Sequence, residues 1–197
     1  SEQDLEDSVF DLEAEMQSEF AEQFALAEGI AFTTGDAVGK PEGFMTNGSV
    51  GEVVSGHAST ILADGLISLV HGIKSDYSKN GTFVFNRNSL ASIRKLKDSA
   101  GQYVFQAGMM LSGSMSNTVL GHPYIEAAAM ADEGSNTYPV AFGDFNRGYM
   151  IVDRVAMAVL RDPFTQATTG NVRYIARRRT GGQVVQAEAI VKLKCST

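Results

Sequence analysis

The first stretch of the chain carries a helical pattern of apolar positions. Apolar residues recur at steps of three or four: Leu5, Val9, Leu12, Met16 and Phe20. This spacing places them along one side of an α-helix as a narrow stripe. Gly29 is the first glycine of the chain, and glycine commonly follows the last turn of a helix. The pattern predicts one long helix over residues 4–28, which lies along an edge of the body because its apolar side is narrow.

The middle of the chain alternates between loops and shorter elements. Residues 33–51 are rich in glycine and predict a loop, and residues 101–123 combine glycine, serine and methionine and predict another. Between them, apolar residues at helical spacing predict a helix over residues 60–77. Thr82–Phe85 predicts a short strand.

A third helix follows that strand. Asn88 or Ser89 can cap it, because short polar side chains accept hydrogen bonds from the free amides of a first helical turn. Its core face holds three apolar residues: Leu90, Ile93 and Leu96.

From Tyr124 onward the pattern is mainly that of strands. Short apolar or alternating runs predict six of them: residues 124–130, 139–143, 149–153, 155–160, 171–179 and 183–194. Thr180-Gly181-Gly182 predicts a hairpin connection between the last two. A long helix, a mixed middle and a β-rich end together indicate an α+β architecture.

Charge is distributed unevenly along the chain. The net charge is −7, yet residues 1–28 hold ten acids and no base. The remaining 13 acids stand against 16 lysines and arginines, so the rest of the chain is net positive. The pattern fits a solvated acidic helix, and it also fits an acidic arm that meets a basic surface of a neighbouring copy.

A cluster of arginines near the C-terminus supplies such a basic surface. On a strand, Arg173, Arg177 and Arg179 share one face and Arg178 takes the other. Arginine forks suit phosphates and also carboxylates across a protein interface. We favour an interface between subunits, with eight candidate residues: Glu13, Glu15, Glu19, Glu22, Arg173, Arg177, Arg178 and Arg179.

Residue patterns typical of enzymes and cofactor proteins are weak here. Gly35–Lys40 superficially resembles a phosphate loop, but its glycine spacing is one residue short and Pro41 follows the lysine. The three histidines, His57, His71 and His122, have no ligand spacing, and the single cysteine excludes a disulfide within the chain. We therefore expect no catalytic, cofactor-binding or metal residues, no small-molecule substrate and no membrane contact.

Four segments carry a resemblance to a known family: Phe32–Met45, Phe83–Tyr103, Leu120–Tyr124 and Val140–Arg154. They resemble, in order, the loop after the spine helix, a strand–helix segment, a Gly-x-Pro turn and a Gly-Asp-Phe strand–turn–strand of tailed-phage major capsid proteins of the Hong Kong 97 type. Each match alone is short, but the four occur in the expected order over nearly the whole chain.

The resemblance implies a fold of two parts and a mechanical function. A peripheral domain of residues 1–51 and 151–197 would hold the spine helix and the strands 171–179 and 183–194 packed with it. An axial domain of residues 52–150 would be inserted into it. Many copies of such a protein form pentamers and hexamers of an icosahedral shell, so the implied partners are copies of itself, with weak and non-specific contacts to packaged DNA. The implied location is the virion capsid, and the host bacterial cytoplasm before assembly.

One departure from the family concerns what precedes the spine helix. Family members carry an N-terminal arm and an extended loop there, so this chain resembles their C-terminal part and alone should stay monomeric or weakly associated. In the best-known member a lysine of that loop joins an asparagine, helped by a glutamate. These two positions fall near Asn171 and Arg178, and an arginine cannot accept the proton at neutral pH. We therefore expect no self-crosslinking.

Three alternatives remain at the level of the sequence. An encapsulin-like bacterial nanocompartment shares the fold but encloses enzymes. An acyl- or phosphoryl-transfer enzyme could carry a site assembled from distant residues, and a nucleic-acid-binding module could use the arginine cluster.

Overall fold

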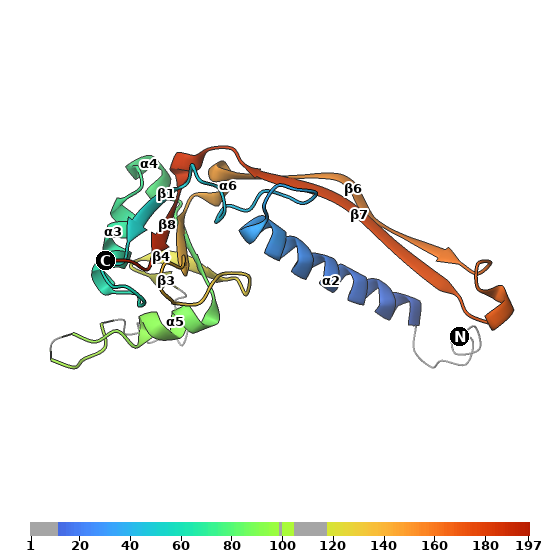
Figure 1. Ribbon diagram of the computed structural model, residues 1–197, viewed down its shortest axis with the longest axis horizontal. Helices are drawn as coiled ribbons and strands as arrows, with labels where there is room; N and C mark the ends of the chain where they lie inside the picture. The colour runs from blue at the N-terminus through green and yellow to red at the C-terminus, as the bar shows by residue number, and fades with distance from the viewer. Residues whose placement is uncertain (1–11, 99, 105–117) are drawn as a thin grey trace, which may run out of the picture.

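The computed structural model describes residues 12–98, 100–104 and 118–197, and it consists of a body and a long arm (Figure 1). The arm is formed by α2 (Leu12–Thr34) and a ribbon of two strands, β6 (Tyr149–Asp162) and β7 (Arg173–Val184). The turn of residues 163–172 connects these two strands at the far end of the arm, and the other described residues form the body. The arm therefore combines a segment near the N-terminus with one from the last third of the chain, while the sequence between them and the C-terminal strand lie in the body.

A six-stranded mixed sheet forms the centre of the body. Its strand order is β1 (Gly51–Val54), β8 (Ile190–Lys194), β5 (Val140–Gly143), β2 (Thr82–Phe85), β4 (His122–Glu126) and β3 (Thr118–Val119). The pairs β1–β8 and β2–β4 are parallel, and the other three pairs are antiparallel. The central strands β8, β5 and β2 are buried almost throughout, which explains their short, continuous apolar sequences.

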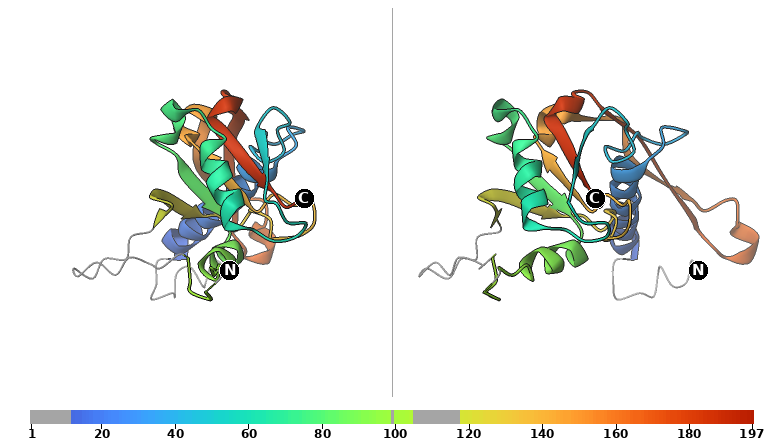
Figure 2. Two further views of the ribbon diagram at one scale, coloured as in Figure 1. Left: turned by 90° about the vertical axis from the view of Figure 1, so that its left-hand side faces the viewer. Right: turned by 60° about the vertical axis from the view of Figure 1, so that its left-hand side comes forward.

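The two faces of the body sheet carry separate apolar clusters. On one face, Phe83, Phe85 and Phe142 pack with residues of α3 (Ala63–His71) and α5 (Arg87–Arg94). On the other, Val84 and Ala141 pack against the segment that follows α2, including Phe44 and Met45. Successive side chains of a strand point to opposite faces, so neighbouring residues of β2 serve different clusters. Figure 2 shows the helices beside the sheet.

The arm is a two-layer structure, with α2 along one face of the ribbon (Figures 1 and 2). The strands β6 and β7 pair antiparallel from Tyr149 opposite Val184 to Asp162 opposite Arg173. Register shifts occur between Asp153 and Val155 and between Val155 and Ala158, which lets the long ribbon bend and twist. A turn containing the short helix η1 (Ala167–Thr169) closes its far end.

The long helix is confirmed, but its predicted end at Gly29 is wrong. Within the described residues α2 continues to Thr34, and the predicted residues 4–11 lie outside them. Gly29 has open space where a side chain would be, while a Cβ on Gly35 would lie 2.1 Å from the carbonyl oxygen of Pro41. The glycine that tertiary structure requires is therefore Gly35, just past the helix end.

The predicted helix over residues 60–77 is divided in two. The helix α3 ends at His71, and α4 (Ser75–Ser78) begins after a break at Gly72. The following strand Thr82–Phe85 is confirmed. The cap of α5 is Asn86, whose side chain accepts a hydrogen bond from the Ser89 amide at 2.7 Å; Asn88 and Ser89 lie inside that helix.

The last third of the chain is β-rich as expected, but its strands begin, end and turn at other residues than predicted. Residues 149–153 and 155–160 belong to one strand, and Thr180-Gly181-Gly182 continues β7 instead of turning. The turn lies at residues 163–172. Residues 183–194 divide between β7, the short helix η2 (Ala187–Ala189) and β8, so the prediction that this whole segment packs with the spine helix is wrong. Strand β7 does contact α2, whereas β8 pairs with β1 and β5 in the body.

The two predicted loops contain regular turns and, in the second, short strands. The segment after α2 is held in turns up to β1. The predicted loop 101–123 contains β3 and the start of β4, and its residues 105–117 lie outside the described part of the chain.

Candidate subunit interface

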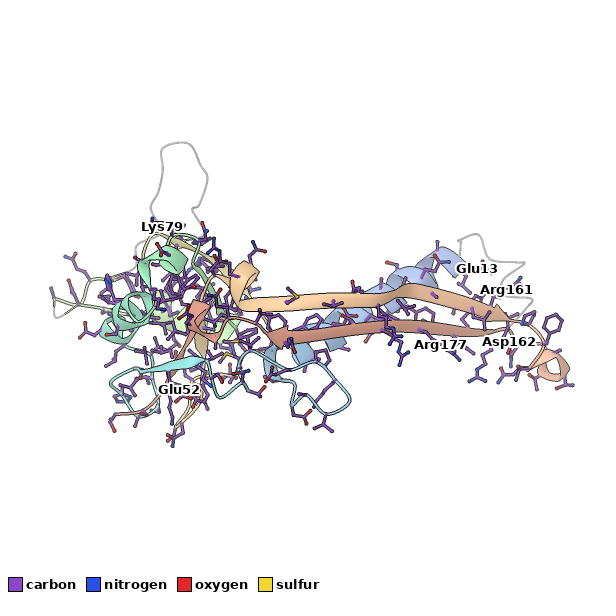
Figure 3. The ribbon with its side chains drawn as sticks, turned by 90° about the horizontal axis from the view of Figure 1, so that it is seen from above. Glu13, Glu52, Lys79, Arg161, Asp162 and Arg177 are labelled. Carbon is purple, nitrogen blue, oxygen red and sulfur yellow. The ribbon has the colours of Figure 1, made fainter. Side chains whose placement is uncertain are left out.

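The two faces of the ribbon differ in what covers them. Alternate residues of β7, from Tyr174 through Arg178 to Gly182, point toward α2 and form the inner face. The other set, from Arg173 through Arg177 to Gln183, forms the outer face and is exposed apart from the half-buried Ile175. Figure 3 looks onto this outer face, and the described chain places no element over it. This alternation follows from the period of two along a strand.

An arginine on the inner face fastens the ribbon to α2. The Arg178 guanidinium lies 2.9 Å from the carboxylate of Glu28 on the helix and 3.2 Å from that of Asp153 on β6. The Arg178 and Glu28 side chains are largely shielded from solvent, which strengthens the ion pair relative to one in water. Arg178 therefore binds within the chain, although the sequence grouped it with residues for a partner subunit.

A second link joins helix and ribbon farther along the arm. The Glu13 carboxylate lies 3.3 Å from Nε of Arg161 and accepts a hydrogen bond of 2.6 Å from the Tyr174 hydroxyl. Burial, together with this hydrogen bond, raises the pKa of Tyr174. Figure 3 shows Glu13 and Arg161 at the same end of the arm. Glu13 thus has partners in its own chain.

The outer face combines charge and apolar surface in two parallel rows. Arg173, Arg177 and Arg179 project from β7 as the sequence pattern predicts. Beside them β6 presents exposed apolar residues, with Val152 57% and Leu160 58% exposed. Rows of exposed apolar side chains of this length mark interaction surfaces in soluble proteins.

The exposed side of α2 is acidic in one half and apolar in the other. Glu15, Glu19 and Glu22 are exposed, and steps of four and three residues place them on one side of the helix. Leu26 and Ile30 continue this side toward the body and are also exposed. The acids and the arginines therefore lie on opposite sides of the arm.

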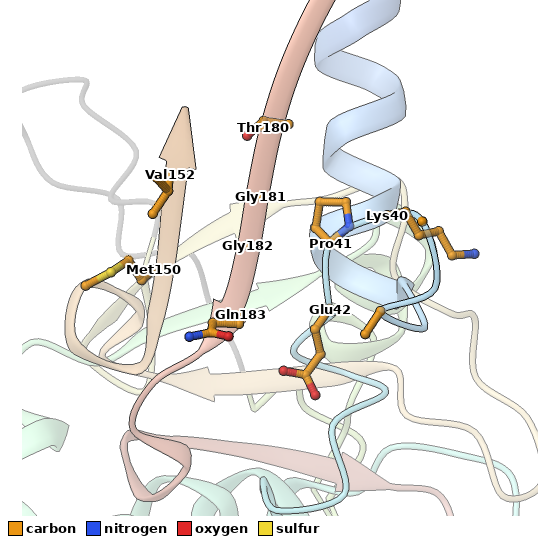
Figure 4. Close-up of a pocket in the computed structure, with 11 residues that line it drawn as sticks. Lys40, Pro41, Glu42, Met150, Val152, Thr180, Gly181, Gly182 and Gln183 are labelled. Atoms are coloured by element: carbon orange, nitrogen blue, oxygen red, sulfur yellow. The ribbon is translucent and has the colours of Figure 1, made fainter. Parts of the chain in front are cut away.

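A pocket of about 650 Å³ lies where the arm meets the body. We call it the base pocket. Figure 4 shows Met150 and Val152 of β6 on one side, Gly181 and Gly182 of β7 in the middle, and the loop around Pro41 on the other side. The amide of Glu42 donates a hydrogen bond of 2.9 Å to the Gly182 carbonyl, which holds the loop against the ribbon.

Tyr149 and Lys192 secure the junction between arm and body. The Tyr149 hydroxyl donates a hydrogen bond of 2.5 Å to the Glu42 carbonyl, and burial raises the pKa of Tyr149 to about 12. The buried Lys192 amine lies within 3.3 Å of the Met45 carbonyl and of the Glu52 carboxylate. Hydrogen bonding from Tyr138, and then from Lys192, holds the pKa of Glu52 below its ordinary value.

Two polar residues of the body, Asp144 and His122, have structural contacts within the chain. The Asp144 carboxylate caps the short helix α6 (Phe145–Gly148) by accepting from the Asn146 amide at 3.2 Å. The ring of His122 packs edge-on against Phe142, 5.0 Å between centroids. Across the ranges that the structure describes, there is no cluster of three or more metal-ligating side chains. The helices within those ranges are too short or too polar to cross a membrane.

Sequence reasoning missed the apolar half of this surface. Met150, Val152 and Leu160 read as ordinary strand residues, because a pattern of alternation does not say which of two faces a neighbour covers. The available signal was the strand-like segment from Tyr149 to Leu160, which is longer than a short body strand and is interrupted only by Asp153 and Arg154.

Comparison with known proteins gives matches over the whole chain. The sequence model of the Phage capsid family matches residues 1–195. A solved structure described as the capsid of an empty GTA particle is 36% identical, with a TM-score of 0.89, and the match covers 100% of this chain and 70% of that chain. The capsid of the native GTA particle matches to the same degree. No curated protein sequence matches the chain.

More distant structures share the fold. The Gordonia phage Cozz structure is 14% identical with a TM-score of 0.65, over 91% of this chain and 62% of that one. The SrpI encapsulin of Synechococcus elongatus is 16% identical with a TM-score of 0.71, over 97% and 68%. These matches confirm the α+β fold of the Hong Kong 97 type. Together with the family match, the sequence identity and the arm-and-body geometry, they establish that this chain belongs to the phage capsid family and is a structural protein, a major capsid subunit of a virion shell.

Proposed function

We propose that copies of this subunit form pentamers and hexamers that close into an icosahedral shell around packaged DNA. The observation that supports this most directly is the arm, a two-layer structure whose outer ribbon face and outer helix side are not covered by any described residues of the chain. A protein that worked alone would gain nothing from a projecting ribbon with rows of exposed apolar side chains. In a shell, neighbouring copies can cover them.

The charged residues of the arm divide into two groups with different roles. Glu13 and Arg178 stabilise the arm itself through the contacts described above. For the other six the proposed role is contact between copies, with Glu15, Glu19 and Glu22 of one subunit near Arg173, Arg177 and Arg179 of another. Exposed ion pairs contribute only about 0–1 kcal/mol each, so the charges mainly orient the encounter. Apolar burial, at about 25 cal/mol per Å², supplies most of the affinity.

The proposed domain division follows the family pattern with revised bounds. The sequence suggested residues 1–51 and 151–197 for the peripheral domain and 52–150 for the axial domain. We propose residues 1–50 and 149–186 for the peripheral domain, because β8 pairs inside the body sheet. The axial domain then comprises residues 51–148 and 187–197.

Contacts with packaged DNA are proposed to be weak and independent of sequence. The net charge of −7 opposes close approach of many phosphates. Before assembly, the subunit is proposed to reside in the host bacterial cytoplasm. The contents of the shell distinguish this function from its alternative, an encapsulin-like compartment, whose fold is similar. Electron microscopy and nuclease-protection assays on purified particles should reveal DNA inside them, whereas particles filled with protein cargo would favour the alternative.

Charge reversal tests the proposed contact between arms. In the complete gene product that contains this chain, changing Glu15, Glu19 and Glu22 together to lysine should slow particle formation, as should changing Arg173, Arg177 and Arg179 to glutamate. Mixing the two variants should restore part of the rate, since each supplies the charge that the other lacks. Light scattering against time measures this, and unchanged kinetics in both variants would refute the contact.

Arg178→Met serves as the matched control for these variants. It removes a charge from the same strand, but one that is bound to Glu28 and Asp153 in its own chain. It should therefore lower the stability of the subunit and leave the salt dependence of assembly unchanged.

A further inference from the structure

The far end of the arm presents a single large aromatic side chain to solvent. Phe164 is 86% exposed, and it lies in the turn 163–172, which we call the tip turn. Most of its neighbours there are polar: Thr165, Gln166, Thr168, Thr169 and Asn171. Exposing a phenylalanine fully to water is unfavourable for a subunit on its own. A partner that buries this side chain would remove that cost.

The tip turn holds Phe164 in a defined position. Oδ1 of Asp162 accepts hydrogen bonds from the amides of Phe164 and Thr165 at 3.0 and 3.1 Å, and the Thr165 hydroxyl donates to the other carboxylate oxygen. Gly170, in the left-handed region at φ 67°, closes the turn. A side chain on a preformed turn loses less conformational freedom on binding than one on a loose loop.

A recess for such a side chain exists at the other end of the same ribbon. In the base pocket, Gly181 lies on the outer face beside Val152 and Met150. Because glycine has no side chain, the row of outer-face residues is interrupted there. The nearest atom to a Cβ built on Gly181 is 4.0 Å away. The lining is apolar at Met150, Val152 and Pro41 and also includes the polar residues Thr180 and Gln183.

We propose that Phe164 of one copy inserts into the base pocket of a second copy, packing over Gly181 against Val152 and Met150. The two sites lie at opposite ends of a continuous ribbon. Ten residues separate Arg173 from Gln183, about 33 Å at about 3.3 Å per residue. One chain therefore cannot bring its own tip to its own base. This inference rests on the proposed shell function, which supplies the second copy.

The contact is heterologous when a copy places its tip on one neighbour and receives the tip of another neighbour in its base pocket. Each subunit then offers one knob and one pocket, and contacts of this kind continue from copy to copy into rings or lattices. A closed shell is built from such repeating contacts. The 650 Å³ of the pocket accommodates an aromatic ring and leaves room for the turn that carries it.

Variants of knob and pocket give the first test, in the complete gene product. Phe164→Ala should raise the protein concentration needed for half-maximal particle formation at least tenfold, with the melting temperature of the unassembled subunit unchanged. Gly181→Ala, Gly181→Val and Gly181→Leu fill the pocket in steps and should impair assembly in that order. The glycine has open space on the outer face and no positive φ, so these substitutions leave the strand intact. Thr168→Ala in the tip turn is the control and should assemble as the unmodified protein does.

Cross-linking gives the second test and identifies the partner site. In particles of a Phe164→Cys, Val152→Cys double variant, formed at a protein concentration high enough to offset the loss of the ring, oxidation should produce a ladder of linked subunits on a denaturing gel. Either single variant should give none. Dimers from Phe164→Cys alone would place two tips together and overturn the proposal.

The outcomes of these experiments distinguish a failure of the knob-and-pocket contact from a failure of the proposed shell function. Normal assembly of both Phe164→Ala and Gly181→Leu would overturn the knob-and-pocket contact and leave the shell function intact. Failure of the unmodified complete protein to form any particle would instead count against the shell function itself.

Discussion

The body and the arm differ in how far their apolar side chains are buried. In the body, the apolar side chains of the central strands are enclosed on both faces of the sheet, and Phe83, Phe85 and Phe142 are 0% exposed. In the arm, α2 covers one face of the ribbon, and residues such as Val152, Leu160 and Phe164 remain in solvent. Apolar residues thus stabilise the fold of the subunit in the body, whereas in the arm they form exposed surface that a neighbouring copy can bind.

This difference assigns stability and assembly to different regions. Substitutions in the body should act mainly on the free energy of unfolding of the single subunit. Substitutions on the uncovered faces of the arm should act mainly on association. The junction, where Tyr149 and Lys192 connect the two, should show intermediate behaviour.

The largest expected effect comes from the body core. Phe142→Ala should lower the free energy of unfolding by about 3–5 kcal/mol, because the cavity left by a buried aromatic side chain is only partly filled by relaxation. Its ring lies 4.6 Å from that of Phe83, centroid to centroid. Phe164→Ala is the matched control and should change the free energy of unfolding by less than about 0.5 kcal/mol. Urea denaturation of unassembled subunits measures both, and equal losses would break the comparison.

A smaller effect is expected at the buried lysine of the junction. Lys192→Met keeps most of the side-chain volume but leaves the Met45 and Asn47 carbonyls without the amine that they accept from. Loss of a partner for buried polar groups costs about 1–3 kcal/mol, and the same denaturation experiment should show it. Lys194→Met, on the same strand but half-buried, is the control and should cost less. A neutral result for Lys192→Met would mean that water replaces the amine without loss.

Tyr149 should make the stability of the subunit depend on alkaline pH. Burial raises its pKa to about 12 in the folded chain, against about 10 in an unfolded one. The neutral phenol is the form that the fold favours, so its contribution is complete below pH about 10 and is lost as the pH rises toward 12.

Tyr149→Phe tests this contribution directly. It should cost about 1 kcal/mol at neutral pH through the lost hydrogen bond to the Glu42 carbonyl. It should also flatten part of the decline in melting temperature above pH 10. An unchanged alkaline decline would assign that titration to other tyrosines, such as Tyr77 or Tyr138, whose pKa values are also raised.

The smallest effect on the single subunit is expected from the exposed acids. Glu22→Gln should change its free energy of unfolding by less than about 0.5 kcal/mol, because the side chain is exposed on the outer side of α2. A loss above 1 kcal/mol would show that this side of the helix stabilises the subunit, and the division between the regions would need revision.

Much of the secondary structure follows from short-range patterns. The long helix up to residue 28, the strand Thr82–Phe85 and the placement of Arg173, Arg177 and Arg179 on one strand face all follow from spacing within about ten residues. Family membership also lay within reach of the sequence, since four short segments in a fixed order are specific when taken together. These features depend on local geometry, which a sequence states directly.

The predictions of strands and turns are wrong where pairing with strands far away in the sequence determines the structure. Thr180-Gly181-Gly182 carries a strong turn signal, but the partner strand β6 supplies a ladder that keeps it extended. Residues 190–194 follow closely on the ribbon strand, yet they pair between β1 and β5. In both places hydrogen bonds to strands far away in the chain outweigh local preference.

The interface shows the same division between what a sequence states and what the fold decides. The sequence by itself determined that acids gather at one end of the chain and arginines at the other, and that both occur in regular elements. Only the tertiary structure decided that Glu13 and Arg178 bind within the chain while Glu15 and Arg177 face solvent, and that Phe164 and the recess at Gly181 stand at opposite ends of one ribbon. The physical reason is that side-chain pairing and exposure depend on which surfaces meet when helix and strands pack together.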